Sequence, residues 1–414
     1  MNMGNGGIVI GVTGPAGWQR NVWALALSVF IAFVGFQFFS PFLPLYVQEL
    51  GVTDPAAVAL WSGVLAAVTP AVSGLLSPVF GRLADRFGRK MMLIRSLAGF
   101  TVIIAAMGLV TSVWQLLAAR LLQGLFAGFT PMAMAVASVS APREKVATAI
   151  ARVQGAQLLS VAVGPAIGGL AATHLGIRPA FYVTAALCAV SLVALIFLFQ
   201  EQRAASGNSR PPARSAPFRE FLRQPHFVPV MALLVLAQFI DRGLALVIPL
   251  QVAHMPEVAA PAATSGLIIS AAAVGATLSA SLAARFSAAI PAGQLLLGQL
   301  VAGGAFCAAM ALAGGWVSLL VLRVLVALCL GGALTLAYAL GGLIVPAEAR
   351  GAAFGWLALG VQIGTAASPL LTGALAAASL PATYLLDGGL AWLGALVLTL
   401  FARDLLRRRA RGES

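Results

Sequence analysis

Long apolar stretches separated by short polar or charged segments run through almost the whole chain. Most are about 20 residues long, the length of an α-helix that crosses a bilayer. They are continuous, whereas the strands of a membrane β-barrel alternate apolar and polar positions. The pattern therefore predicts an all-α integral membrane protein with about twelve transmembrane helices. The expected spans are 22–47, 57–80, 92–111, 115–139, 148–173, 180–199, 227–253, 263–286, 292–313, 317–341, 352–377 and 384–402.

The longest polar segment between two spans is 200–226, which contains several Arg and Ser residues and two consecutive prolines. A segment of this composition cannot bury an apolar face and is typical of a linker. The predicted organisation is an N-terminal six-helix bundle (1–199), a cytoplasmic linker (200–226), a C-terminal six-helix bundle (227–402) and a basic cytoplasmic tail (403–414).

The two halves of the sequence repeat each other. The spacing from Pro142 to Pro165 recurs from Pro346 to Pro369, and in both halves a glycine follows the second proline by four residues. A tandem repeat of this kind predicts two pseudo-symmetric bundles, the arrangement of parallel-repeat transporters with a central site between the halves.

The composition agrees with a membrane protein. Hydrophobic residues make up 60 % of the chain, charged residues 9 %, and the mean hydropathy is +0.97. The net charge of +13 would suggest a nucleic-acid partner in a soluble protein, but here most Lys and Arg fall in alternate loops on one side of the predicted spans. This positive-inside asymmetry puts both termini in the cytoplasm and indicates no nucleic-acid partner. We expect a plasma membrane protein, in a bacterium one of the inner membrane.

Four motifs carry chemistry or packing information. They are the basic loop Gly81–Lys90, the segment Arg120–Gly124, the glycine-rich segment Gly164–Gly169 and the proline-containing segment Pro41–Tyr46. Together they resemble motifs of the major facilitator superfamily, and more narrowly of its twelve-helix drug:proton antiporter branch. The resemblance covers nearly the whole chain. It implies the major facilitator fold, transport by alternating access, no cofactor and function as a monomer.

The resemblance also implies a role for the loop between the second and third spans. In families with this motif its acidic residue, here Asp85, lies near the start of helix eleven, here Gly351–Phe354, and near basic groups at the cytoplasmic end of helix four, here Arg143. We expect this contact to latch the cytoplasmic side shut. The simpler reading of the loop is a basic segment that fixes topology and contacts lipid headgroups. The predicted latch comprises Gly81, Asp85, Arg86, Gly88, Arg89 and Arg143.

The fifth span carries the segment typical of exporters. Gly164, Gly168 and Gly169 lack side chains, so a neighbouring helix can approach closely, and Pro165 removes one backbone hydrogen bond and favours a kink. The segment is either a tight packing interface or, in addition, a pivot that seals the pathway against leak.

Charges within the spans are the candidate coupling groups. Asp241 is the only acidic residue near the middle of a predicted span, and a carboxyl that titrates differently in two access states can carry a proton. The alternative is a structural pair between Asp241 and an arginine of another helix. By resemblance Arg120 is assigned to proton coupling, whereas Arg323, at the equivalent place in the second half, lacks the Gln-Gly that follows Arg120.

Aromatic and polar side chains within the spans are candidates for the substrate cavity. Stacking and cation–π contacts suit lipophilic, often cationic compounds, although each of these residues could instead serve in ordinary helix packing. The predicted cavity residues are Phe36, Gln37, Gln157, Gln238, Arg323, Tyr338 and Gln362.

Nothing in the sequence indicates an enzyme, because it contains no phosphate-binding loop with Lys and no close cluster of metal-ligating or nucleophilic residues. The first hypothesis is a proton-coupled exporter of small lipophilic compounds or drugs, with the substrate, protons and the bilayer as partners. The second is a transporter of a specific polar solute, such as a sugar or an organic anion. The third is a non-transporting membrane sensor or scaffold with the same fold.

Overall fold

The computed structural model describes residues 17–39, 42–142, 145–199, 218–287, 289–345 and 350–406. Within these ranges every regular element is a helix, so the predicted all-α class is confirmed. The first half contains α1 (Gly17–Phe38), α2 (Leu43–Glu49), α3 (Pro55–Phe87), α4 (Arg89–Met107), α5 (Val113–Leu125), α6 (Phe129–Ser140), α7 (Val146–Leu175) and α8 (Ile177–Leu198). The second half contains α9 (Phe218–Leu222), α10 (Phe227–Ala253), α11 (Pro261–Phe286), α12 (Ala292–Met310), α13 (Trp316–Leu330), α14 (Ala333–Ile344), α15 (Arg350–Ala378) and α16 (Leu380–Phe401).

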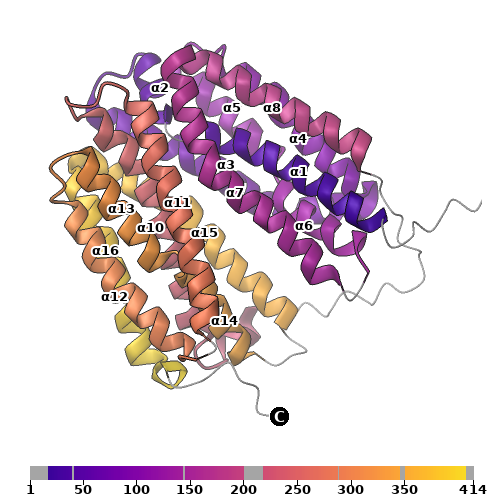
Figure 1. The fold of residues 1–414 in the computed structure, drawn as a ribbon, viewed down its shortest axis with the longest axis vertical. Coiled ribbons are helices and arrows are strands. Elements are labelled where there is room, and N and C mark those ends of the chain that lie inside the picture. Colours follow the sequence, from indigo (N-terminus) through magenta and orange to yellow (C-terminus); the bar gives the residue numbers. More distant parts are fainter. Residues whose placement is uncertain are drawn as a thin grey trace, which may run out of the picture.

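The helices form two bundles that lie side by side, the first half in indigo to magenta and the second in orange to yellow in Figure 1. Each bundle buries the inner faces of its own helices, and the core of the first bundle continues across the seam to Leu246 and Leu250 of α10, Ala262 of α11 and Ala376 of α15. The bundles meet along two helix pairs, α3 with α15 and α7 with α11. These are the second and fifth spans of one half against the eleventh and eighth spans of the chain.

Within the described residues, eleven segments are long and apolar enough to cross a membrane. The expected span 115–139 falls short because it is divided into α5 and α6 by a break at Phe126–Gly128. Gly128 causes the break, since its φ of +98° is unfavourable for a residue with a side chain. The second half interrupts its equivalent span at Gly331–Gly332, between α13 and α14. The expected first span, 22–47, is likewise divided, because α1 ends at Phe38 and α2 starts at Leu43.

Arg95 of α4 stabilises the break in the first half. Its guanidinium donates hydrogen bonds to the carbonyl oxygens of Leu125 (3.3 Å) and Ala127 (3.0 Å), which the interrupted helix leaves without intrahelical partners. The same guanidinium lies over the rings of Phe80 and Phe126, at 4.8 and 5.8 Å from their centroids. The two terminal nitrogens of the guanidinium are thus bound by backbone oxygens, and the charge lies over aromatic rings rather than beside a carboxylate.

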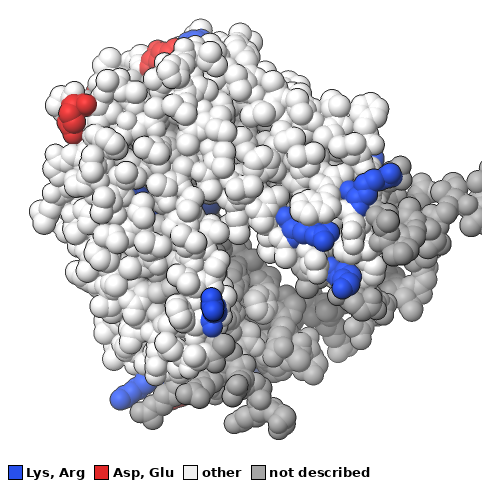
Figure 2. Space-filling model, viewed as in Figure 1, with Lys and Arg blue, Asp and Glu red and all other residues white. Residues whose placement is uncertain are grey.

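Charge separates the two ends of the molecule. We call the end that carries the α3–α4, α6–α7 and α8–α9 connections the basic end, and the end that carries the α2–α3 and α10–α11 connections the distal end. Most of the Lys and Arg visible in Figure 2 lie toward the lower right, and the visible acidic residues lie at the upper left. At the distal end, Arg178 pairs with Glu49 at 3.2 Å. This asymmetry agrees with the positive-inside pattern of the sequence.

The two bundles pack tightly against each other near the distal end. A Cβ placed on Gly63 of α3 would collide with the carbonyl of Pro369 in α15, and one on Gly169 of α7 would collide with the carbonyl of Ala262 in α11. Only glycine permits so close an approach of two backbones. Across the second pair, the backbone N–H of Ala166 also donates to Oγ of Ser270 at 2.9 Å.

Nearer the basic end, the same helices present open space. No atom lies within 4 Å of a Cβ placed on Gly74 of α3, Gly155 of α7 or Gly355 of α15. In Figure 1 the α7 and α11 ribbons diverge in this direction. The close glycine contacts between the bundles therefore lie at the distal end, and these three glycines make no such contact toward the basic end.

Candidate functional site

An ion pair joins two spans of the second half. Nη2 of Arg323 in α13 donates to Oδ1 of Asp241 in α10 at 3.1 Å. The arginine side chain is 8 % exposed and the aspartate side chain 54 %. Asp241 lies near the middle of α10, as the sequence predicts, and its partner belongs to another helix. One end of the pair is thus buried among helices while the other remains accessible.

A second acidic residue, Asp387 of α16, lies beside this pair. It is 1 % exposed and interacts electrostatically with Arg323 and Asp241. Asp387 was not among the predicted coupling groups, because the expected span began at residue 384 and put it near a helix end. The helix begins at Leu380, so Asp387 lies about two turns inside it. The sequence signal was an acidic residue within an apolar run.

Arg120 lies in the other bundle and makes a different set of contacts. It is 5 % exposed, its Nε donates to the Leu65 carbonyl at 3.0 Å, and its Nη1 donates to Oε1 of Gln123 at 3.0 Å. The guanidinium also lies 4.5 Å from the ring centroid of Phe39. Among the salt bridges of the described residues, none involves Arg120. Arg120 and Asp241, both predicted to act in proton coupling, are therefore not brought together in this conformation.

The glycines of the fifth span pack against two neighbouring helices, α1 and α11. Cβ atoms on Gly164 and Gly168 would meet α1, the first 2.8 Å from Cβ of Gln37 and the second in collision with the Phe38 carbonyl. Gly169 instead faces α11 of the other bundle. Pro165 lies inside α7, next to the Ala166–Ser270 hydrogen bond between the bundles. This segment is therefore a packing surface both within a bundle and between bundles.

Only part of the predicted latch can be described. Nη1 of Arg89 donates to the Ala135 carbonyl at 3.2 Å, within the first bundle. Gly88 ends α3 with a φ of +90°, and the exposed Arg86 lies 5.2 Å from the ring centroid of Phe87. The side-chain surroundings of Gly81 and Asp85, and all of Arg143, lie outside the described part of the structure.

The seven predicted cavity residues do not gather at one place. Phe36 packs in the first bundle, with ring centroids 4.7 Å from Phe100 and 6.1 Å from Phe129. Tyr338 stacks on Phe354 at 5.8 Å, in the second bundle. The remaining members vary in burial: Gln238 and Arg323 are buried, Gln37 and Gln157 are half-buried, and Gln362 is exposed.

The structure has an apolar pocket of about 440 Å³ on the first bundle, between the basic-end halves of α1 and α7. Its walls include Trp23, Leu27, Phe30 and Leu159, and Arg152 is its charged member. The Arg152 guanidinium lies 5.1 Å from the Trp23 ring centroid. This chemistry suits a flat apolar molecule. None of the seven predicted cavity residues lines this pocket.

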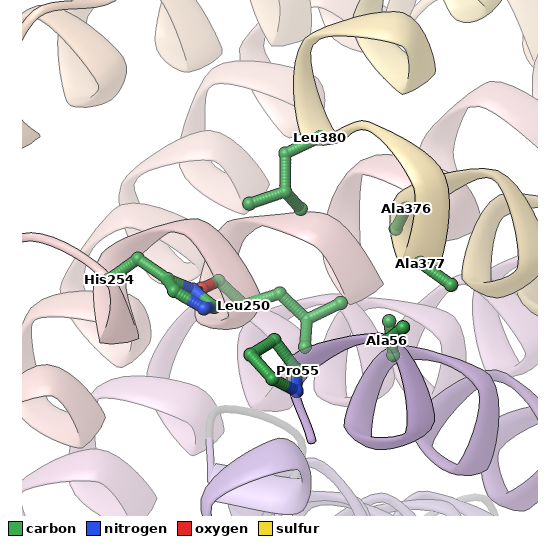
Figure 3. A pocket seen from close by; sticks show the side chains of 8 residues that line it. Pro55, Ala56, Leu250, His254, Ala376, Ala377 and Leu380 are labelled. Atoms are coloured by element: carbon green, nitrogen blue, oxygen red, sulfur yellow. The ribbon is translucent and has the colours of Figure 1, made fainter.

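A second, small pocket of about 70 Å³ marks the closed distal seam. Figure 3 shows His254 and Leu250 from α10 facing Pro55 and Ala56 at the start of α3, with the end of α15 above them. Residues of four helices from both bundles, α3, α10, α15 and α16, converge here. Its size suits closure of the seam better than binding of a substrate.

Two six-span bundles related by an internal repeat, with glycine-mediated crossings between them and charged groups inside the spans, are the architecture of parallel-repeat membrane transporters. The sequence model of the Major Facilitator Superfamily matches residues 25–288 and 231–413, so the chain belongs to this superfamily. The predicted resemblance is confirmed. The chain is a secondary transporter in the membrane for a small-molecule substrate and not an enzyme.

Curated relatives carry one name. The chain is 30 % identical over 367 residues, 88 % of both proteins, to "Multidrug resistance protein MdtG" of Rahnella sp. strain Y9602. It is 34 % identical over 289 residues to the protein of the same name from Escherichia fergusonii, covering 69 % of this chain and 70 % of that protein.

Solved structures share the fold. A bacterial homologue of the human lysosomal transporter Spinster, in an inward-facing and unoccupied conformation, matches with a TM-score of 0.78 at 17 % identity, covering 97 % of this chain and 100 % of that chain. The human organic anion transporter MFSD10 matches with a TM-score of 0.66 at 16 % identity, covering 92 % of this chain and 99 % of that chain. Both likenesses concern the fold alone.

Proposed function

We propose that this protein exports small lipophilic compounds, including drugs, in exchange for protons. The observation that carries the proposal is the Asp241–Arg323 pair inside the membrane spans, with Asp241 54 % exposed. A carboxylate at that depth is costly unless it is paired or protonated, so a role in ion exchange explains its presence. Relatives named as multidrug resistance proteins support the class of substrate.

Transport then proceeds by rocking of the two bundles about the midplane. The glycine crossings at Gly63 and Gly169 allow the distal seam to close, and the open space at Gly74 and Gly155 gives substrate access from the basic end. With both termini and the basic end in the cytoplasm of a bacterial inner membrane, the described conformation is the one that loads substrate. The protein acts as a monomer.

The apolar pocket between α1 and α7 supports a lipophilic substrate. Trp23, Leu27 and Phe30 provide ring and alkyl surface but few fixed hydrogen-bond partners, so compounds of different shape can be accepted. Its volume of about 440 Å³ lies within the usual range for drug-sized ligands.

Export of organic anions is the second candidate. Arg120 is 5 % exposed, and no salt bridge of the described residues neutralises it. A guanidinium of this kind suits a carboxylate or phosphate group on a substrate.

The loop Gly81–Lys90 is proposed to latch the cytoplasmic side. Asp85 would accept hydrogen bonds from the free N–H groups at the start of α15 when the basic end closes. An anion at a helix N-terminus is favoured by roughly 0.3–1 kcal/mol, and by up to ~2 kcal/mol where it is partly buried.

Efflux of a fluorescent dye tests the function. Cells expressing the protein are loaded with ethidium, and its loss is followed with and without a protonophore. The proposal predicts faster loss than in cells with an empty vector, and abolition of the difference by the protonophore. Equal loss in both cells, together with export of an anionic dye such as fluorescein, would replace the proposal with the second candidate.

A further inference from the structure

A buried carboxyl of the second bundle is not explained by the ion pair. Asp387 is 1 % exposed, and neither of its carboxyl oxygens has a hydrogen-bond partner among the described residues. Buried carboxyl oxygens are normally hydrogen-bonded, and an exception calls for an explanation such as an ion or a proton. Packing does not explain the carboxyl, because an apolar side chain would fill the same space without the cost of burying a polar group.

Two hydroxyl groups face the same spot. A Cβ placed on Gly243 of α10 would lie 2.9 Å from Oγ1 of Thr372, 3.2 Å from Oγ of Ser368 and 3.3 Å from Oδ2 of Asp387. Three oxygen atoms, from α15 and α16, thus converge on the same side of Gly243, which has no side chain to keep them apart. Thr372 Oγ1 also has no hydrogen-bond partner in the described residues, whereas Ser368 donates to the Phe239 carbonyl at 2.6 Å and keeps its lone pairs free.

The charges around this spot favour a single added cation. Arg323 interacts with Asp387 and pairs with Asp241, so one positive group faces two carboxyls. The set has a net charge of −1 when both carboxyls are ionised and zero when one monovalent cation is bound. Burial of an uncompensated charge is costly, so the buried set favours the loaded state. Arg323 also has an unpartnered Nε, available to a second acceptor when the cation leaves.

The other titratable groups near Asp387 do not change this count. Cys307 of α12 and Tyr384 of α16 interact with Asp387 and are neutral in their ordinary states. The Tyr384 hydroxyl donates its hydrogen bond to Oε1 of Gln251, so it is not available as a donor to Asp387. Arg242, the neighbour of Asp241 in α10, is exposed.

We propose that Asp387, Thr372 and Ser368 form the binding site for the monovalent cation whose gradient drives transport. The cation is a proton on the carboxyl or Na⁺ among the three oxygens. Loading leaves Arg323 on Asp241, and release turns Arg323 toward the ionised Asp387. The cation then enters at the accessible Asp241 and binds at the buried Asp387. This site deepens the proposed ion-driven export and rests on it.

Cation binding to the purified protein tests this site without any transported substrate. The full chain in lipid nanodiscs is examined by infrared difference spectroscopy between acidic and alkaline pH, and by binding of radioactive Na⁺. We expect the wild type to show either a carboxylic-acid C=O band that disappears at alkaline pH or saturable Na⁺ binding. The Asp387→Asn variant should lose that signal, and Thr372→Val should weaken cation affinity by about tenfold, as expected for loss of one oxygen partner of a charged group.

Two further variants separate the site from a folding defect. Asp387→Glu should retain the signal, with a shifted pH midpoint or Na⁺ affinity. Glu49→Gln, which removes an acidic residue from the distal surface, should match the wild type. The site is refuted if the wild type shows neither signal, or if a folded Asp387→Asn protein keeps it. Failure of ethidium export would contradict the proposed function but leave this binding result unchanged, so the two outcomes are distinguishable.

Discussion

Arg323 of α13 and Asp241 of α10 form a 3.1 Å ion pair between two spans of the second bundle, with the arginine buried and the aspartate half exposed. The equivalent arginine of the first bundle, Arg120, instead donates to the carbonyl of Leu65 and the amide oxygen of Gln123. The two halves therefore share a repeat but differ in charge chemistry. We assign ion coupling to the second bundle because it holds the carboxyls.

Loss of the accessible carboxyl should uncouple transport. In Asp241→Asn, Arg323 keeps Asp387 as a charged neighbour, so the protein should fold. Arg323 and the ionised Asp387 then have no net charge, so no cation is needed for neutrality. We expect ethidium transport driven by a pH gradient in proteoliposomes to fall to the level without a gradient, while exchange of ethidium at equal concentrations persists. Asp54→Asn, at the N-cap of α3, is the acidic control. Full gradient-driven transport by Asp241→Asn would remove Asp241 from coupling.

A methyl group at the distal crossing should hold the bundles apart. Gly63→Ala introduces a Cβ against the Pro369 carbonyl, and overpacking of this kind costs about 1–3 kcal/mol. Ala56 and Ala377 line the distal seam in Figure 3, and cysteines introduced at these positions report its closure. If the added methyl group makes closure less favourable by about 1.4 kcal/mol, their cross-linking should fall about tenfold.

Gly74→Ala is the matched control for that experiment. Gly74 lies on the same helix, and a Cβ there meets no atom within 4 Å. Cross-linking should match the parent protein, in which the native cysteines are replaced. Equal yields for Gly63→Ala and Gly74→Ala would show that the crossing does not limit closure.

Arg120 should be required for stability as well as transport. Arg120→Leu removes the hydrogen bonds from the guanidinium to the Leu65 carbonyl and the Gln123 amide oxygen, and lost hydrogen bonds to a charged group cost about 2 kcal/mol. We expect a lower apparent melting temperature in detergent than for the wild type. Arg242→Gln, which changes an exposed arginine, should leave that temperature unaltered. If Arg120→Leu is as stable as the wild type but no longer exports an anionic dye, Arg120 serves the substrate instead.

The basic loop should matter for turnover rather than for insertion. Asp85→Asn is expected to reach the membrane at normal levels but to transport ethidium poorly, because the state closed at the basic end loses its contact with the start of α15. The distal cysteine pair at Ala56 and Ala377 should accordingly cross-link more often. Normal turnover in this variant would reduce the loop to a topology signal.

Much of the fold followed from sequence because its causes are local or periodic. Span length predicts the helices, and the proline spacing predicts the repeat; the orientation inferred from the basic loops stays a prediction. The breaks near Gly128 and Gly331 were missed, since a glycine in an apolar run is equally compatible with a continuous helix. Asp387 was missed because the expected span began at residue 384, and because its importance depends on groups of α10, α13 and α15 that only the fold brings together.

The predicted cavity residues show a second limit of prediction from sequence. Aromatic and amide residues inside spans are correctly recognised as unusual, but sequence does not reveal which bundle face they occupy. Phe36 packs against Phe100 within the first bundle, while Trp23, which was not predicted, lines the observed apolar pocket. Side-chain direction relative to neighbouring helices decides between these outcomes, and it is set by tertiary packing.

Proton movement caused by the substrate tests the central claim most directly. Proteoliposomes with a pH-sensitive dye in the lumen, and no imposed pH gradient, receive ethidium on one side. The account predicts that the wild type moves protons opposite to the ethidium flux and that Asp241→Asn moves none. Ethidium transport by the wild type without any counterflow of protons, or with protons moving in the same direction, would contradict it.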